Sequence, residues 1–111
     1  MTETETTHRP AILRIWRGTT LRERADDYAD YLTRTGLPGY LRTPGNTSVA
    51  CTRRDLGDTV EFCMVTTWTD IEAVKAFAGA DPDVAVFYPE DDDYLVDREL
   101  TVSHYEIFAT G

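Results

Sequence analysis

The chain has 111 residues, of which 41% are hydrophobic, and this suits a single domain with a modest core. Its formal net charge of -9 repels phosphate backbones and anionic lipid, so we do not expect nucleic acid or a membrane surface as a partner. No apolar run approaches the ~20 residues of a membrane span. Residues 1–10 lack the apolar core of a signal peptide. We expect a disordered tail there, followed by one domain over residues 11–111, in the cytoplasm.

Residues 11–18 (AILRIWRG) predict the first strand. Leu13 and Ile15 point to one face, and Arg14 and Trp16 point to the other. Because both faces are apolar near the middle, we expect a central strand that is covered on both sides. Arg14 beside Trp16 is either a buried cation in a site or, as we favour, the partner of a surface or interface carboxylate.

A first long helix is predicted from Thr20, with Glu23 at the reciprocal capping position, to about Thr35. Gly36 is expected to end it. Residues 37–45 (LPGYLRTPG) contain two Pro-Gly pairs and therefore predict a loop. The helix carries an apolar stripe at helical spacing, formed by Leu21, Ala25, Tyr28 and Leu32.

Residues 48–54 and 59–68 are rich in residues that suit strands, and they predict a hairpin. If the turn is centred on Gly57, Cys51 lies directly opposite Cys63. A cross-strand disulfide is then conceivable, but two small buried thiols are the expected state in a reducing compartment.

The same register places Asn46 opposite Trp68, at the far end of the hairpin. Phe62 and Met64 lie along the same face as Trp68, opposite small polar residues. This pattern predicts either a recess roofed by Trp68 or plain packing of Trp68 beneath a helix.

The second helix is expected to begin after Thr69, which with Glu72 forms a capping box. Gly79 suits the left-handed position that closes a helix. Between them lies an apolar stripe at helical spacing, made of Ile71, Val74, Phe77 and Ala78.

Beyond the second helix, Asp81 is predicted to start a short helical turn, and Pro89 to open another. The acidic run at residues 91–93 could bind a metal, but it lacks the pattern of a calcium loop. We interpret it as acidity at a helix start, and we expect no metal site in the chain. Tyr88 and Tyr94 are better candidates for ligand contact, because each combines an apolar ring with a hydroxyl.

Residues 98–109 (RELTVSHYEIFA) predict the last strand. His104 is the only histidine inside the predicted domain, since His8 lies in the tail. It could act as a general acid or base near neutral pH, or it could be a satisfied core or interface residue.

These elements predict an α+β fold of the ferredoxin-like type, in the order βαββαβ. Right-handed crossovers give a four-stranded antiparallel sheet of order 4-1-3-2, with both helices on one face. The first and the last strand carry apolar residues on both sides, so the other face of the sheet needs cover. A second copy of the chain is the simplest cover, so we expect a homodimer.

Three segments resemble the antibiotic biosynthesis monooxygenase-like family of the dimeric α/β-barrel superfamily. They are TTWTDIEAVKAFAG (residues 66–79), FYPEDDDYL (87–95) and VSHYEIF (102–108). The resemblance implies a barrel formed by two copies and a cleft between sheet and helices. Members include cofactor-independent oxygenases of phenols and anthrones, haem-degrading oxygenases and polyketide cyclases. In the oxygenases the Trp that ends the third strand lines the cleft, a role that the resemblance gives to Trp68.

The sequence also departs from that family. The oxygenases place an Asn four residues before the Trp, where this chain has Met64. Asn46, opposite Trp68 in the predicted register, is a possible substitute. Haem-degrading members use an Asn on the first strand and a His after the second helix. Here the first strand has no Asn, and Tyr88 stands near the position of that His, so haem degradation is disfavoured.

Our first functional hypothesis is a cofactor-independent monooxygenase that oxidises a small aromatic or polyketide-like phenol. His104 would take the phenolic proton or stabilise the resulting anion. The alternatives are a non-oxidative cyclase or isomerase in the same cleft, and a dimeric protein that binds an aromatic ligand without turnover. The candidate catalytic residues are His104 and Trp68, and the candidate ligand-binding residues are Asn46, Phe62, Met64, Tyr88, Tyr94 and Trp16.

Overall fold

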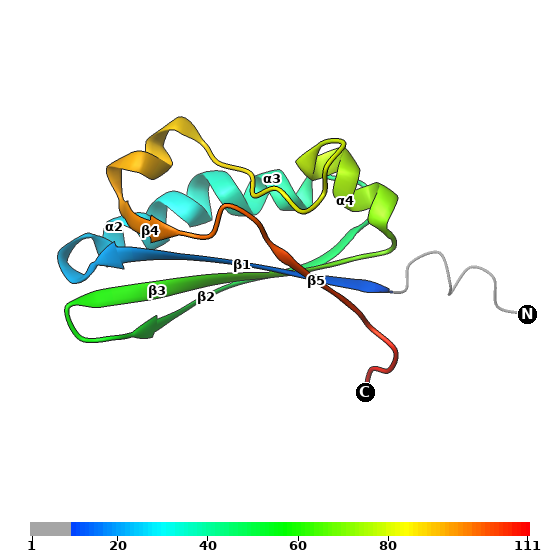
Figure 1. Cartoon of the computed structure of the whole chain (residues 1–111), viewed down its shortest axis with the longest axis horizontal. Coiled ribbons are helices and arrows are strands. Elements are labelled where there is room, and N and C mark those ends of the chain that lie inside the picture. The colour runs from blue at the N-terminus through cyan, green and yellow to red at the C-terminus, as the bar shows by residue number, and fades with distance from the viewer. Residues whose placement is uncertain (1–9) are drawn as a thin grey trace, which may run out of the picture.

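The computed structural model describes residues 10–111, and the remainder of the predicted N-terminal tail lies outside the described residues. An antiparallel sheet forms the base of the molecule (Figure 1). Its strand order is β2-β3-β1-β4, and the short strand β5 also pairs with β1. This order confirms the predicted ferredoxin-like α+β fold. The strands are β1 (Ile12–Leu21), β2 (Asn46–Asp55), β3 (Thr59–Trp68), β4 (Leu95–Arg98) and β5 (Ser103–Glu106).

The helices lie together on one side of this sheet (Figure 1). A continuous helical run after β1 comprises η1 (Arg22–Arg24), α2 (Ala25–Tyr31), the π-helical η2 (Leu32–Gly36) and α3 (Leu37–Leu41). After β3 come α4 (Ile71–Ala78) and the 3-10 helix η3 (Pro89–Asp93). The acidic turn predicted to open at Pro89 is therefore confirmed.

The core lies between the sheet and the helices because the two central strands alternate strictly. Every second residue of β3, from Val60 to Trp68, is buried, and β1 alternates in the same way from Arg14 to Thr20. Each apolar side chain buried there contributes roughly 1.5–3 kcal/mol. The buried hydrophobic side chains of the two strands are Trp16, Val60, Phe62, Met64 and Trp68.

The start and the end of the first helix differ from the prediction. Thr20 does not begin the helix: it is a fully buried residue of β1, which runs on to Leu21. Gly36 does not end the helix, because its backbone is helical and α3 follows directly. The loop predicted over residues 37–45 is therefore wrong for its first half. Pro38 has no N–H to give to the preceding turn, and the π-helical segment before it accommodates that missing donor.

The predicted register of the hairpin is wrong by one residue. Leu56 N–H donates to the carbonyl of Thr59 at 2.9 Å, so the loop is the two residues Gly57 and Asp58. A loop centred between these two residues, rather than on Gly57, moves every pair by one and exchanges the two faces of β2. Cys51 therefore lies opposite Met64 on the helix side, and Cys63 pairs with Thr52. Both cysteines are free thiols, but neither is buried as expected: Cys51 is exposed and Cys63 is half-buried.

A β-bulge at the start of β2 leaves one residue, Asn46, with the partner that the sequence predicts. The register shifts between Asn46 and Ser48, so Asn46 still faces Trp68. The predicted face of small polar residues beside Trp68 does not form. That face of β2 carries Val49 and Cys51 instead.

The second helix begins one residue later than predicted. Asp70, not Thr69, is its N-cap, and its carboxylate accepts the N–H of Ala73 at 2.8 Å. Gly79 closes the helix with φ of 100°, as predicted.

The C-terminal third contains two further differences. The helical turn predicted from Asp81 is limited to one hydrogen-bonded turn, in which the N–H of Val84 donates to the carbonyl of Asp81 at 3.3 Å. From Val84, which forms an isolated bridge with Thr101, the chain has no helical structure up to η3. The single predicted last strand is split into β4 and β5. Glu99 still bonds to β1, since its N–H donates to the carbonyl of Arg17 at 2.9 Å and its carbonyl accepts the indole N–H of Trp16 at 2.8 Å. The chain then leaves β1, because the carbonyl of Leu100 accepts the N–H of Ala85 and Thr101 pairs with Val84.

No helix in the described part of the chain is both long and apolar enough to cross a membrane.

Gly45, which directly precedes β2, packs closely against α4, and a substitution there tests that contact. Its φ is +91°, and a Cβ there would lie 2.4 Å from the Cβ of Ala73. Gly57 has a similar φ of +100° but open space around it. We expect Gly57→Ala to lower the free energy of unfolding by about 1 kcal/mol, and Gly45→Ala to lower it by roughly 3 kcal/mol. Urea denaturation measures both; equal losses would show that the contact with Ala73 contributes nothing.

Candidate functional site

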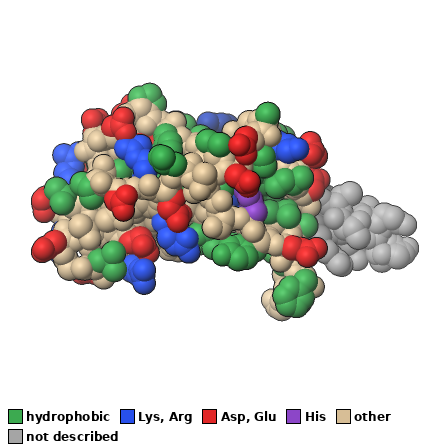
Figure 2. All heavy atoms as spheres, viewed as in Figure 1, with side chains coloured by type: hydrophobic (Ala, Val, Ile, Leu, Met, Phe, Trp, Pro, Cys, Tyr) green, Lys and Arg blue, Asp and Glu red, His purple; other side chains and the backbone are tan. Residues whose placement is uncertain are grey.

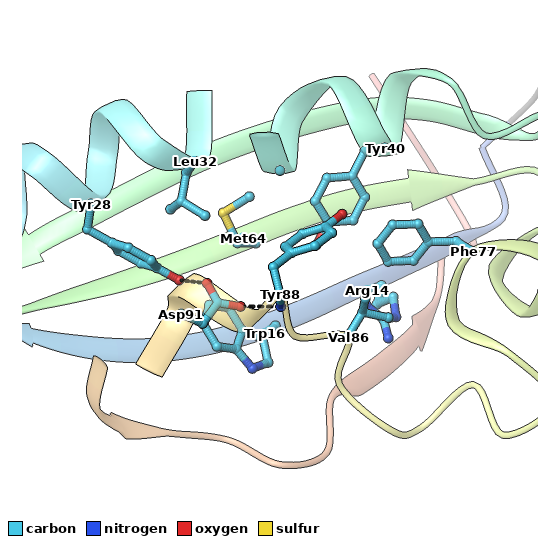
Figure 3. A pocket seen from close by; sticks show the side chains of 11 residues that line it. Arg14, Trp16, Tyr28, Leu32, Tyr40, Met64, Phe77, Val86, Tyr88 and Asp91 are labelled. Atoms are coloured by element: carbon cyan, nitrogen blue, oxygen red, sulfur yellow. Dashed lines mark hydrogen bonds between the residues drawn. The ribbon is translucent and has the colours of Figure 1, made fainter. Parts of the chain in front are cut away.

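A cavity of about 30 Å³ lies between the sheet and the helices (Figure 3). Its walls come from the strands β1 and β3, the helical run after β1, the helix α4, the segment before η3 and η3 itself. Residues with aromatic rings dominate the lining, and two charged residues, Arg14 and Asp91, interrupt it. The lining residues are Arg14, Trp16, Tyr28, Leu32, Gly36, Tyr40, Met64, Phe77, Val86, Tyr88 and Asp91.

Asp91 is a buried carboxyl group at one end of this cavity. Only 4% of the residue is exposed. The hydroxyl of Tyr28 donates to Oδ1 at 3.3 Å, and the backbone N–H of Tyr88 donates to Oδ2 at 2.7 Å. Burial is the main cause that raises the pKa of the Asp91 carboxyl, and these two hydrogen bonds oppose it. Burial and the nearby Asp91 also raise the pKa of the Tyr28 hydroxyl.

Arg14 lies beside Phe77 and Val86, away from Asp91, in Figure 3. The residue is only 2% exposed, and its guanidinium stands 5.6 Å from the centre of the Phe77 ring. Its Nη2 donates to the carbonyl oxygens of Pro82 and Val84, at 3.5 and 3.1 Å. Within residues 10–111 no carboxylate forms a salt bridge with it. The expected pairing of Arg14 with a surface or interface carboxylate is therefore not found there.

Aromatic side chains separate the two charged ends. Tyr40 and Phe77 stack with ring centres 4.6 Å apart, and Tyr88 lies beside Tyr40 in Figure 3. Burial raises the pKa of the Tyr40 hydroxyl to about 12, against the opposing influence of the Arg14 guanidinium. Gly36 and Gly39 leave room on the helix side: a Cβ on Gly39 would lie 2.9 Å from the hydroxyl of Tyr88.

Three of the residues predicted from sequence line this cavity: Trp16, Met64 and Tyr88. Three other predicted residues do not line the cavity but pack against side chains that do. Trp68 packs against Phe77 and Tyr40, with ring centres 5.7 and 6.4 Å apart, and its indole N–H donates to Thr66. Phe62 and Tyr94 each contact Tyr28, at 5.0 and 5.3 Å between ring centres.

Asn46 and His104 lie apart from the cavity lining. The Asn46 amide donates to the carbonyls of Ser48 and Thr67, so it holds the bulge at the start of β2. His104 sits on β5 opposite Arg14, and its Nδ1 lies 3.1 Å from a carboxylate oxygen of Asp83. Its Nε2 is buried and has no hydrogen-bond partner within residues 10–111.

From the sequence, a buried site cation was the less favoured of two interpretations of Arg14, and Asp91, Tyr28 and Tyr40 were not among the candidate site residues. A signal existed for Asp91, because it is the third residue of a turn opened by Pro89, where a carboxylate can cap the turn. For Tyr40 the signal was weak: an aromatic residue in a predicted loop can cover the mouth of a pocket or simply anchor the loop. In the described residues no cluster of three or more His, Cys, Asp or Glu side chains could hold a metal ion.

The fold and the cavity can be compared with known proteins. No family model matches the sequence, and no curated protein matches it. Solved structures do match, at low sequence identity. A candidate antibiotic biosynthesis monooxygenase from Bacillus cereus has a TM-score of 0.65 and 12% identity, over 93% of this chain and 98% of that chain. The chain therefore has the fold of the antibiotic biosynthesis monooxygenase-like proteins, as the resemblance in its sequence predicts.

Two other solved structures share the fold. SnoaB, a cofactor-independent oxygenase from Streptomyces nogalater, has a TM-score of 0.58 and 19% identity, over 93% of this chain and 96% of that chain. A dimeric ferredoxin-like protein from an uncultured marine organism has a TM-score of 0.66 and 11% identity, over 97% and 96%. The matching structures also include a haem-degrading protein, so the fold alone does not select one activity.

The buried carboxyl of Asp91 gives a test that uses pH. A raised pKa in the folded state means that the folded protein holds the proton more tightly than the unfolded chain. Asp91 therefore lowers the free energy of unfolding as pH rises from its ordinary pKa of 3.8 through the raised value. Asp91→Asn should gain stability relative to the wild type between pH 4 and pH 7, measured by urea denaturation at each pH. A difference that stays constant across this range would contradict the assignment.

Proposed function

We propose that the cavity is the active site of a cofactor-independent monooxygenase that acts on a small aromatic or polyketide-like phenol. The observation that carries the proposal is the arrangement of the walls: aromatic rings lie between a buried carboxyl group and a buried guanidinium. A planar ring fits between such walls, a carboxylate can take its proton, and a cation can stabilise the anion. The oxygenase activity of SnoaB, which shares the fold, supports it.

The chemistry balances without a bound metal or flavin. The Asp91 carboxylate takes the acidic proton of the substrate, and the resulting anion gives one electron to dioxygen. The radical and superoxide combine at a ring carbon that carries a hydrogen, and the resulting peroxide anion takes the proton back from Asp91 to form a hydroperoxide. Loss of water from the hydroperoxide leaves a carbonyl, so one oxygen atom remains in the product and the other leaves as water. The buried walls exclude bulk water during these steps.

Substrate entry requires the cavity to widen, because ligand pockets are usually roughly 300–1,000 Å³ and this one is about 30 Å³. The segment at residues 86–88 is the element best suited to move. It carries Val86 and Tyr88 in the cavity wall and has no regular secondary structure. Its neighbour Ala85 is tied to Leu100 by a backbone hydrogen bond, which would form one end of the moving segment.

Oxygen consumption with a panel of anthrones, quinols and naphthols tests the proposal. We expect uptake by the wild type that Asp91→Asn lowers by at least about a hundredfold, since the general base is lost. His104 is the second candidate base, held by Asp83 but outside the lining, so we expect a smaller loss in His104→Ala. Equal activity in Asp91→Asn and the wild type would reject Asp91 as the base. No uptake by the wild type with any member of the panel would reject the oxygenase.

The same residues could also catalyse a non-oxidative reaction. A carboxylate and a buried cation can move a proton on a carbonyl compound, as an isomerase or a cyclase requires, without using dioxygen. Product formation that proceeds equally under nitrogen and under air would favour this alternative. Saturable ligand binding with no product under either gas would favour a binding protein.

We also propose that the protein works as a homodimer, formed through the sheet face opposite the helices. Leu13 and Ile15 of β1 lie on this face with Val65 of β3, and Tyr105 of β5 pairs with Leu13 and is 56% exposed. Hydrophobic atoms reach the surface along this lower side of the molecule in Figure 2. The dimeric marine protein with the same fold supports this assembly.

Light scattering tests the dimer. The wild type should have twice the mass of one chain, and Ile15→Lys with Val65→Lys should give monomers, because two charges would be buried in the interface. Leu41→Lys is the control: Leu41 is 63% exposed at the end of α3, on the helix side. A monomeric wild type, or a dimer that survives the double substitution, would contradict the proposed interface.

A further inference from the structure

Arg14 is a buried cation whose charge is not neutralised by any carboxylate in the described part of the chain. Burial of such a group costs several kcal/mol when no anion compensates it. Only the Nη2 atom has partners, the carbonyls of Pro82 and Val84. Nε is fully buried and has no hydrogen-bond partner among residues 10–111. A buried donor without a partner is rare, and in a cavity wall it points to a ligand.

The neighbours of Arg14 do not supply the missing anion. Asp83 is near enough to favour the charged guanidinium, but it is mostly exposed and its Oδ1 lies beside Nδ1 of His104. Tyr40, the other group whose charge would favour the cation, is held neutral because burial raises its pKa to about 12. Asp91, the one buried carboxyl of the cavity, bonds to Tyr28 and Tyr88.

We propose that Arg14 is an anion-binding residue and that the ligand of the cavity is an acidic phenol or enol bound in its ionised form. The inference deepens the proposed function and rests on its placement of the site. A single ionised oxygen fits better than a carboxylate does. The Nη2 atom is already occupied by two carbonyls, which leaves Nε without the parallel partner that a bidentate carboxylate uses. The aromatic ring of the ligand would then lie along Phe77 and Tyr88.

The arrangement has a consequence for the ligand. A buried cation lowers the pKa of a bound hydroxyl, because it favours the charged form. Arg14 therefore supplies the anion at a pH where the free phenol is still protonated. Its own pKa is lowered by burial, and the ligand anion would offset that loss of solvation.

The test uses 4-nitrophenol, whose ionised form is coloured and whose neutral form is not. Bound to the wild type, it should ionise at a lower pH than in free solution, as read from its absorbance. Arg14→Met should abolish this shift and weaken binding of the phenolate by about tenfold to a hundredfold. Arg34→Met is the matched control, since Arg34 is exposed and paired with Asp30 on the helix surface. It should leave both quantities unchanged.

Folding is checked separately. An Arg retained only for structure would make Arg14→Met unstable in urea. A functional cation should give a variant that is as stable as the wild type or more stable, because an unpaired buried charge is replaced by an apolar side chain of similar length. A destabilised Arg14→Met that still lowers the pKa of the bound 4-nitrophenol would overturn the inference.

Two further ligands distinguish a phenolate site from a carboxylate site and from a site that binds neutral rings equally well. Tighter binding of 4-nitrobenzoate than of the phenolate would overturn the choice of a phenol or enol. Binding of neutral 4-nitroanisole with no preference for the phenolate, or failure of all three to bind, would overturn the anion site itself. Phenolate binding through Arg14 without oxygen uptake from any phenol would reject the oxygenase and leave the anion site standing.

Discussion

The position of β1 between its partners is the constraint on which the rest of the structure depends. It pairs with β3 along its whole length and with β4 and β5 on its other edge. Because strand residues alternate between faces, this pairing turns Arg14, Trp16 and Thr20 toward the helices. Leu13 and Ile15 are turned the other way, toward the face proposed for dimerisation. One strand thus supplies both the cation of the cavity and the centre of the outer face.

The cavity combines groups that are costly to bury. Arg14 and Asp91 are both almost inaccessible, and they are not paired with each other. Desolvation lowers the pKa of the first and raises the pKa of the second, so each is destabilised in its charged form. The surrounding aromatic contacts, such as Tyr28 with Phe62 and Tyr40 with Phe77, compensate by packing. Perturbed groups that face one cavity are typical of functional sites.

Local patterns predicted the architecture but not the details that depend on distant contacts. The spacing of apolar residues indicated the strands and the two helical regions, one after β1 and one after β3. Gly79 correctly marked the end of α4. Gly36 resembles a helix end locally, yet the helix continues through it and its missing side chain leaves room for the cavity. The hairpin register failed because its turn is the two residues Gly57 and Asp58, and a shift of one residue exchanges the faces of β2.

The sequence by itself determined the class of fold, the order of the strands and the apolar second face, because these follow from the period of the hydrophobic pattern and the handedness of the connections. It also brought Trp16, Met64 and Tyr88 forward as candidates, since buried aromatic and flexible side chains cluster at the core. Only the tertiary structure decided that Arg14 lacks a carboxylate partner and that Asp91 is buried beside Tyr28. Both facts depend on which segments meet across the core, and no local spacing encodes the solvation of a charge.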